Sequence, residues 1–172
     1  MKIKKILRRV FRKTERNLSA FKIPPVRDSG QPKFTLTAVA IVKDEVAIFP
    51  EWIAFHQSVG FEHFYVYDNG STDGTVELLA RYREAGIVTV IPWPHFVEKY
   101  HIQSLAYAHA LSSFGPDSKW MAFFDADEFF FCPSGEEIKS ILSERPQVPG
   151  FLVFRHTYGR CGHLTKPKGL II

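Results

Sequence analysis

The sequence TLTAVAIVKDEVAIFPEWIAFHQSVGFEHFYVYD (residues 35–68) contains two apolar segments separated by a helical pattern. Residues 35–42 are β-branched and apolar on both faces, which is typical of a strand buried in a parallel sheet. Residues 49–60 have helical spacing, with a proline near the first position and a glycine as the stop. Residues 61–68 are a second apolar segment. This succession predicts a strand, a helix and a parallel second strand.

The same alternation continues along the chain. It predicts helices over 75–86, 100–115 and 136–144, and strands over 87–93, 119–127 and 150–159. We therefore expect an α/β fold with a mostly parallel sheet and helices on both faces. Such sheets bind ligands at the carboxyl ends of their strands, so the chemistry should lie just after residues 42, 68 and 125.

Acidic residues follow each of these three strands. Asp44 and Glu45 follow the first, the segment DNGSTDGT (68–75) ends the second, and DADE (125–128) ends the third. DNGSTDGT has two interpretations: a polar turn that caps the next helix, or a site where Asp68 accepts hydrogen bonds from a ribose or base. The segment could cap the helix whether or not Asp68 also binds a ligand.

The DADE segment is the most specific of the three. If the backbone stays extended, Asp125 and Asp127 project from one face of the strand, about 7 Å apart at their Cα atoms. Carboxylates beside an apolar strand end need a partner. Mg²⁺ or Mn²⁺, held by one or two carboxylates and by substrate phosphates, would supply it. The alternative role, capping the following helix, is predicted for Ser134 instead.

Charge is unevenly distributed over the 172 residues. Residues 1–33 hold eleven Lys or Arg and two acids, a net charge of +9, whereas residues 34–172 have a net charge of −5. A basic nucleic-acid-binding domain is therefore not expected, and no nucleic-acid partner is predicted. Cys132 and Cys161 fit no zinc or disulfide spacing, which indicates free thiols in a reducing compartment.

The N-terminal segment 1–20 has apolar residues at helical spacing and basic residues between them. Such a helix can lie on an anionic membrane surface, be solvated, or pack on its own domain. Residues 24–33 are proline-rich, which predicts a linker. We expect a basic helix and linker over 1–33, a folded domain over 34–172, and a cytoplasmic protein that is peripheral on the inner face of the membrane through residues 1–20.

The order of EWIAFH, YDNGSTD and DADEF, from about Thr37 to the C-terminus, resembles the family-2-like glycosyltransferases of GT-A fold. It is most similar to the branch related to glycosyltransferase family 92 and its bacterial relatives. The resemblance implies a Rossmann-like fold, a nucleotide-diphosphate sugar donor, a glycan or lipid-linked acceptor, and Mn²⁺ or Mg²⁺ at a DxD motif. It also implies that the acceptor half is incomplete and that the chain is truncated at its C-terminus.

The resemblance assigns roles to particular residues. Asp125 and Asp127 would form the metal and diphosphate site, with His163 as a further metal ligand. The substrate-binding candidates are Asp44, Glu45, Asp68, Asn69, Ser71, Asp73, Gln103 and Asp125. Glu51, Trp52 and His56 also match the pattern, and core packing or a helix cap would explain them equally well.

The expected reaction displaces a nucleoside diphosphate from the anomeric carbon by an acceptor hydroxyl, which needs a carboxylate base if the configuration inverts. Glu128 is the nearest candidate for that base. Two alternatives remain. A binding remnant without turnover would lack a base and an acceptor pocket, and a nucleotidyltransferase would need a glycine-rich loop that KDEVAIFPE (43–51) does not have.

Overall fold

A computed structural model describes residues 30–94, 101–146, 148–159 and 169. In chain order the elements are β1 (Phe34–Val42), α2 (Phe49–Ser58), β2 (His63–Asp68), α3 (Thr75–Glu84), β3 (Val88–Pro92), α4 (Ile102–Ser113), a single 3₁₀ turn (Gly115–Asp117), β4 (Ser118–Phe123) and α5 (Ile138–Ser143). Within these ranges, no helix has the length and apolar character needed to cross a membrane.

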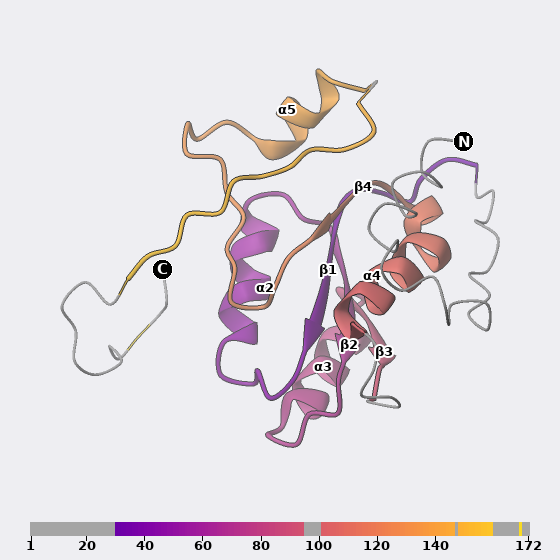
Figure 1. Ribbon diagram of the computed structural model, residues 1–172, viewed down its shortest axis with the longest axis vertical. Coiled ribbons are helices and arrows are strands. Elements are labelled where there is room, and N and C mark those ends of the chain that lie inside the picture. Colours follow the sequence, from indigo (N-terminus) through magenta and orange to yellow (C-terminus); the bar gives the residue numbers. More distant parts are fainter. Residues whose placement is uncertain (1–29, 95–100, 147, 160–168, 170–172) are drawn as a thin grey trace.

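The four strands form one parallel sheet in the order β3-β2-β1-β4, which confirms the predicted α/β class (Figure 1). Val39 of β1 lies opposite Tyr65 of β2 on one side and Phe123 of β4 on the other. The chain runs outward from β1 through β2 to β3, and then returns to place β4 on the other side of β1. This reversal is the switch point where open parallel sheets bind ligands.

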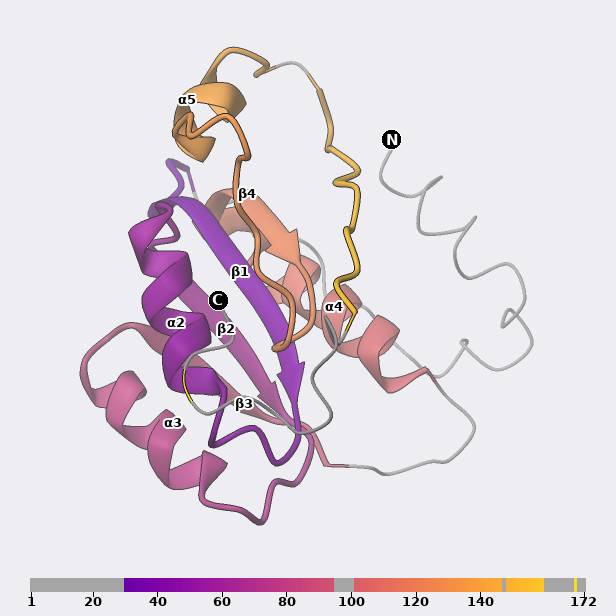
Figure 2. The ribbon, with the colours of Figure 1, turned by 90° about the vertical axis from the view of Figure 1, so that its left-hand side faces the viewer.

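Helices cover both faces of the sheet, as the alternating pattern predicts (Figure 2). On one face, α2 and α3 pack against alternate residues of the strands, such as Ala38 and Phe64. On the opposite face, α4 packs against Val39 and Tyr65. The central strands β1 and β2 are buried on both faces because they lie between the helix layers, which accounts for their nearly continuous apolar sequence.

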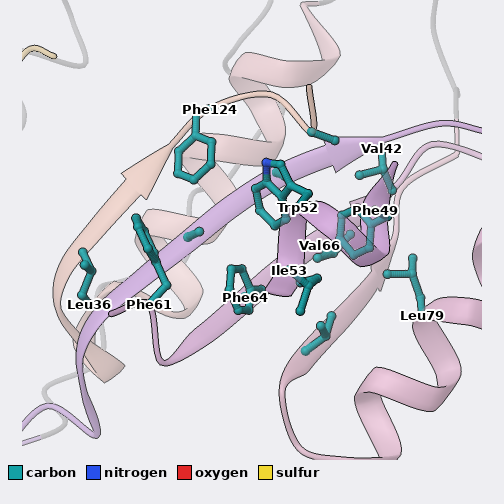
Figure 3. Close-up of a cluster of buried hydrophobic side chains, with 14 of the residues drawn as sticks. Leu36, Val42, Phe49, Trp52, Ile53, Phe61, Phe64, Val66, Leu79 and Phe124 are labelled. Atoms are coloured by element: carbon teal, nitrogen blue, oxygen red, sulfur yellow. The ribbon is translucent and has the colours of Figure 1, made fainter. Parts of the chain in front are cut away.

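The larger core lies under α2 (Figure 3). Trp52 is fully buried, and its ring centroid lies 5.2 Å from that of Phe49 and 5.3 Å from those of Phe64 and Phe124. Aromatic side chains bury much area and interact favourably through tilted ring pairs. This cluster therefore ties α2 both to β2 and to the segment that leaves β4.

Glycines end two helices as predicted. Gly60 follows α2 with φ of 105° and Gly86 follows α3 with φ of 74°, and both angles lie in the left-handed region that favours glycine. The chain can therefore reverse directly into β2 and β3.

The predicted strand over 119–127 is wrong at its end, because β4 stops at Phe123. Beyond it the backbone turns, and the Glu128 N–H donates to the Asp125 carbonyl oxygen at 3.1 Å. Asp125 and Asp127 therefore lie in a turn and not on one face of a strand. Backbone pairing with β1 ends at Phe124, whose N–H donates to the Val39 carbonyl oxygen at 3.4 Å.

Two further predictions fail near the C-terminal side. Residues 150–159 form no strand, and Leu152 is 99% exposed, because no strand in the described part of the chain pairs with them. The α5 helix begins at Ile138 after Glu137, so Ser134 does not cap it. The Ser134 hydroxyl instead donates to the Glu136 carboxylate at 2.8 Å.

Several predictions fall outside the described residues. These are the basic helix over 1–20, most of the linker over 24–33, Cys161 and His163. Cys132 lies within the described part and is a free thiol, as expected. The division into a tail over 1–33 and a domain over 34–172 stays a prediction.

Candidate functional site

The candidate site lies where β1, β2 and β4 end. The loop after β1 begins at Lys43, the loop after β2 begins at Asn69, and a turn follows β4. Val42 and Asp68 are paired in the sheet, so the first two loops start side by side. We call residues 125–128 the acidic turn.

Asp44 joins the loop after β1 to the loop after β2. Its carboxylate accepts from the Thr72 N–H at 2.6 Å, and its own N–H donates to the Ser71 hydroxyl at 3.0 Å. Its φ of 58° lies in the left-handed region, which is uncommon for a residue other than glycine. The paired hydrogen bonds offset this backbone strain.

Asp73 makes a second connection between the same loops. Its carboxylate accepts from the Val46 N–H at 3.0 Å and from the Thr75 N–H at 3.0 Å, where α3 begins. The buried Thr75 hydroxyl in turn accepts from the Glu45 N–H at 2.9 Å. The N-cap residue of α3 is Gly74, without a side-chain cap hydrogen bond. Asp73, one residue earlier, also accepts from the Thr75 hydroxyl and so connects the start of α3 to Glu45.

Asp68 and Asn69 shape the start of the loop after β2. The Asp68 carboxylate accepts from the N–H groups of Gly70 at 3.3 Å and Ser71 at 3.2 Å. The Asn69 N–H donates to the Val42 carbonyl oxygen at 2.8 Å, which extends the β1–β2 pairing by one residue. The side chains of both residues are half-buried at the sheet edge.

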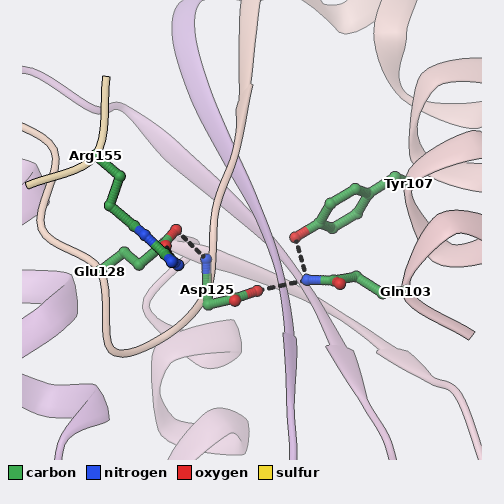
Figure 4. A network of polar contacts seen from close by, with 5 residues as sticks. All are labelled: Gln103, Tyr107, Asp125, Glu128 and Arg155. Atoms are coloured by element: carbon green, nitrogen blue, oxygen red, sulfur yellow. Dashed lines mark hydrogen bonds and ion pairs between the residues drawn. The ribbon is translucent and has the colours of Figure 1, made fainter. Parts of the chain in front are cut away.

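Glu128, within the acidic turn, contacts both Asp125 of the same turn and Arg155 of the extended segment 148–159 (Figure 4). One Glu128 carboxylate oxygen accepts from the Asp125 N–H at 3.1 Å. The other lies 3.0 Å from Nη1 of Arg155, whose side chain is 72% exposed. Both oxygens of Glu128 are therefore engaged within the turn, and its role as a base stays a prediction.

Gln103 approaches the acidic turn from α4. Its side-chain amide nitrogen donates to Asp125 Oδ1 and to the Tyr107 hydroxyl at 3.0 Å (Figure 4). Burial raises the pKa of Tyr107 to about 12, so its hydroxyl stays protonated at neutral pH. Gln103 therefore links a helix on one face of the sheet to the carboxylate beyond β4.

Negative charge accumulates between the first loop and the acidic turn. Partial burial raises the pKa of Glu45, and the charges of Asp127, Asp73 and Asp44 raise it further. Partial burial also raises the pKa of Asp125, with Glu128 and Asp127 adding to the effect. The charge of Asp127 contributes to both shifts, which indicates that Glu45, after β1, and Asp125, after β4, lie within range of a common charge.

No group of three or more His, Cys, Asp or Glu side chains arranged to hold a metal ion occurs among the residues that the structure describes. Mg²⁺ and Mn²⁺ bound with a nucleotide need only one or two carboxylates, because phosphate oxygens and water complete the shell. Asp127 is exposed and Asp125 is half-buried beside it. Their carboxylate oxygens fit such a cation, and burial, followed by the charges of Glu128 and Asp127, raises the pKa of Asp125.

The structure places the predicted residues in two groups, one in the loops after β1 and β2 and one at the acidic turn. The charge of Asp127 acting on Glu45 connects the two groups, and His163 lies outside the described part. Asp44, Ser71 and Asp73 mainly join loops, whereas Glu45 and Asp127 lie where their charges interact. Sequence reasoning missed Tyr107 and Arg155. The i, i+4 spacing of Tyr107 from Gln103 could have indicated the first, whereas Arg155 was assigned to a strand that does not form.

The sequence model of the family described as Glycosyltransferase family 92 matches residues 37–159. A family 92 protein of Oryza sativa subsp. japonica is 26% identical over 142 residues, covering 78% of this chain and 23% of that protein. A family 92 protein of Ricinus communis is 30% identical over 106 residues, covering 61% and 18%. Galactan beta-1,4-galactosyltransferase GALS2 of Arabidopsis thaliana is 33% identical over 109 residues, covering 60% and 21%. The chain thus spans about a quarter or less of these relatives.

Proposed function

Since this chain belongs to glycosyltransferase family 92, we propose that it forms the donor-binding half of a glycosyltransferase, with a nucleotide-diphosphate sugar bound at the ends of β1, β2 and β4. The observation that carries this proposal is the position of the acidic turn at the switch point of the sheet, where Asp127 and Glu45 interact electrostatically. Glu45 and Asp68 would contact the nucleoside, and the acidic turn would face the diphosphate.

Asp125 and Asp127 would hold Mn²⁺ or Mg²⁺ together with the diphosphate. A bound divalent ion would neutralise the charge that develops on the leaving diphosphate. Gln103 fixes the orientation of the Asp125 carboxylate through its amide nitrogen. The exposed Arg155 guanidinium lies beside the same turn and adds a positive charge that phosphate oxygens could share with Glu128.

The proposed reaction forms a bond between an acceptor hydroxyl and the anomeric carbon while the bond to the diphosphate breaks. Glu128 is the candidate base for the hydroxyl proton, as the sequence suggests. The acceptor is a glycan or a lipid-linked sugar. Because two relatives are named as galactan beta-1,4-galactosyltransferases, a nucleotide-activated galactose is the first donor to test.

A second candidate function is donor binding without transfer. It is favoured by one observation: both carboxylate oxygens of Glu128 already accept hydrogen bonds, from the Asp125 N–H and from Arg155. Each of these oxygens keeps a second lone pair, so transfer would require an acceptor hydroxyl to reach Glu128 beside the Asp125 N–H and Arg155. The two functions differ in turnover and share the same binding site.

The test uses the full chain with Mn²⁺ and a panel of nucleotide sugars. Calorimetry measures binding, and release of the nucleoside diphosphate with and without a galactan acceptor measures turnover. Metal-dependent binding with acceptor-stimulated release supports the transferase. Binding without release supports the second function, and absence of binding to the whole panel contradicts both.

We also propose that residues 1–20 attach the protein to an anionic membrane surface on the cytoplasmic side. The support is the sequence alone, in which basic residues alternate with apolar residues at helical spacing. Attachment would place the donor site close to a lipid-linked acceptor.

A further inference from the structure

Two buried side chains of α2 hold the segment that contains the acidic turn. The Trp52 Nε1–H donates to the Glu128 carbonyl oxygen at 2.9 Å. One helical turn later, Nε2 of His56 lies 3.0 Å from the backbone nitrogen of Phe130. Trp52 and His56 are both fully buried. We call this pair the α2 anchor.

The hydrogen bonds of His56 define a single neutral form of its ring. A backbone N–H can only donate, so Nε2 accepts from Phe130 and carries no proton. The proton is therefore on Nδ1, which donates to the Trp52 carbonyl oxygen at 2.7 Å. Burial lowers the pKa of His56 to about 4, which agrees with a neutral ring at physiological pH.

The α2 anchor also contacts the residue before the acidic turn. The ring of Phe124 lies 4.8 Å from that of His56 and 5.3 Å from that of Trp52, centroid to centroid. Phe124 directly precedes Asp125, and Phe130 follows Glu128 by two residues. The anchor therefore contacts the chain on both sides of the turn, by packing before it and by hydrogen bonds after it.

We propose that Trp52 and His56 are positioning residues that set the placement of Asp125 and Asp127 for a metal-bound diphosphate. This inference rests on the proposed function of the acidic turn. Because β4 ends at Phe123, the sheet does not hold the turn directly, and pairing with β1 does not extend to its carboxylates. The α2 anchor supplies that connection, and Gln103 then orients Asp125 from the opposite side.

Two substitutions separate positioning from simple packing. His56→Leu fills the core with an apolar side chain and leaves the Phe130 N–H without its acceptor. His56→Gln replaces the ring nitrogen with an amide oxygen that can accept from that N–H. His63→Leu is the matched control, because His63 is also a buried histidine but lies at the start of β2 and bonds to Thr89 of β3.

The probe is inorganic pyrophosphate with Mn²⁺, titrated into the full chain by calorimetry. We expect His56→Leu to bind about tenfold more weakly than wild type, because the turn loses one buried hydrogen bond. His56→Gln should recover most of the loss, and His63→Leu should bind as wild type does. Amide hydrogen exchange should rise at Phe130 in His56→Leu while exchange in β1 and β2 stays unchanged.

Equal affinity of His56→Leu and wild type would overturn the inference, as would an equal loss in His63→Leu. Unchanged exchange at Phe130 would also overturn it. If wild type itself fails to bind Mn²⁺ and pyrophosphate, the proposed function fails and the inference fails with it. Trp52→Phe, which removes the donor to the Glu128 carbonyl oxygen, provides the second test. Weaker binding in His56→Leu and Trp52→Phe, with recovery in His56→Gln and no loss in His63→Leu, supports both the function and the inference.

Discussion

The side-chain amide of Gln103 donates a hydrogen bond to the carboxylate of Asp125, across the switch point between α4 and the end of β4. The same amide nitrogen bonds to Tyr107, one turn further along α4. Asp125 is therefore oriented by a helix on one face of the sheet, while the segment after it is held by α2 on the other face.

Replacing Gln103 should weaken the proposed site without unfolding the protein. In Gln103→Ala, we expect the affinity for pyrophosphate with Mn²⁺ to fall about three- to tenfold, because Asp125 loses the donor that orients it. Calorimetry provides the measurement. Gln57→Ala on the exposed face of α2 is the control, and an equal effect in both variants would contradict a specific role for Gln103.

Removing either acid of the DxD motif should abolish the contribution of the metal. For Asp125→Asn and Asp127→Asn we expect the Mn²⁺-dependent gain in pyrophosphate affinity to fall at least about tenfold, because a neutral amide binds a hard cation poorly. Asp117→Asn, at the opposite end of β4, should behave like wild type. A gain that persists in the double variant would rule out this metal assignment.

Arg155 should contribute to diphosphate binding through its charge and its geometry. We expect Arg155→Ala to weaken pyrophosphate binding several-fold and Arg155→Lys to give an intermediate value, because lysine keeps the charge but not the planar fork. Arg145→Ala, at an exposed position after α5, is the control. Equal affinities in the Ala variants of Arg155 and Arg145 would show that Arg155 neutralises the charge of Glu128 without contributing to diphosphate binding.

Acid should destabilise the fold through buried histidines. Burial lowers the pKa of His56 to about 4 from its ordinary value of 6.5, so between these values the unfolded chain binds a proton that the folded chain does not. The free energy of unfolding should therefore decrease as the pH falls from about 6.5 toward 4, by up to about 3 kcal/mol. Burial also lowers the pKa values of His63 and His109, which act in the same direction.

Urea unfolding at pH 7 and pH 5 measures this effect. The decrease in stability should be smaller in His56→Gln than in wild type, because glutamine does not titrate in this range. An identical decrease in both proteins would assign the acid sensitivity to the other histidines.

The basic N-terminal segment should carry any membrane attachment. Deletion of residues 2–20 should reduce sedimentation with vesicles that contain anionic lipid, and added salt should reduce it for the intact chain. A Leu7→Glu variant keeps the basic residues and interrupts the apolar stripe, so it should bind more weakly than wild type. Unchanged sedimentation of the deletion at low salt would contradict the proposal.

The fold was largely predictable because each strand carries a strong local pattern. Residues 35–42 are apolar on both faces, and Gly60 and Gly86 end helices where the pattern stops. The end of β4 was not predictable from residue types, because Asp125 and Asp127 suit an extended strand and a turn equally well. A hydrogen bond from the Glu128 N–H to Asp125 decides between them.

The site was predictable in part for a similar reason. Strand ends in a parallel sheet meet at one edge, so Asp44, Glu45, Asp68 and the acidic turn could be grouped before their contacts were known. The hydrogen-bond partner of each residue could not be predicted in this way. Whether Asp73 faces a ligand or the Val46 N–H depends on how two loops approach each other, and no local pattern contains that information.

The extended segment 148–159 has a consequence for handling the protein. It is exposed along its length, with Leu152 and Phe154 at 99% and 93%, and it lacks the strand pairing that protects a backbone from proteases. A protease that cuts after aromatic residues should therefore cleave after Phe154, which is the most exposed of the aromatic side chains that the structure describes. Such a cut would leave the sheet intact but would separate Arg155 from the domain. The circular dichroism spectrum would then stay unchanged although the acidic turn had lost its ion pair with Arg155.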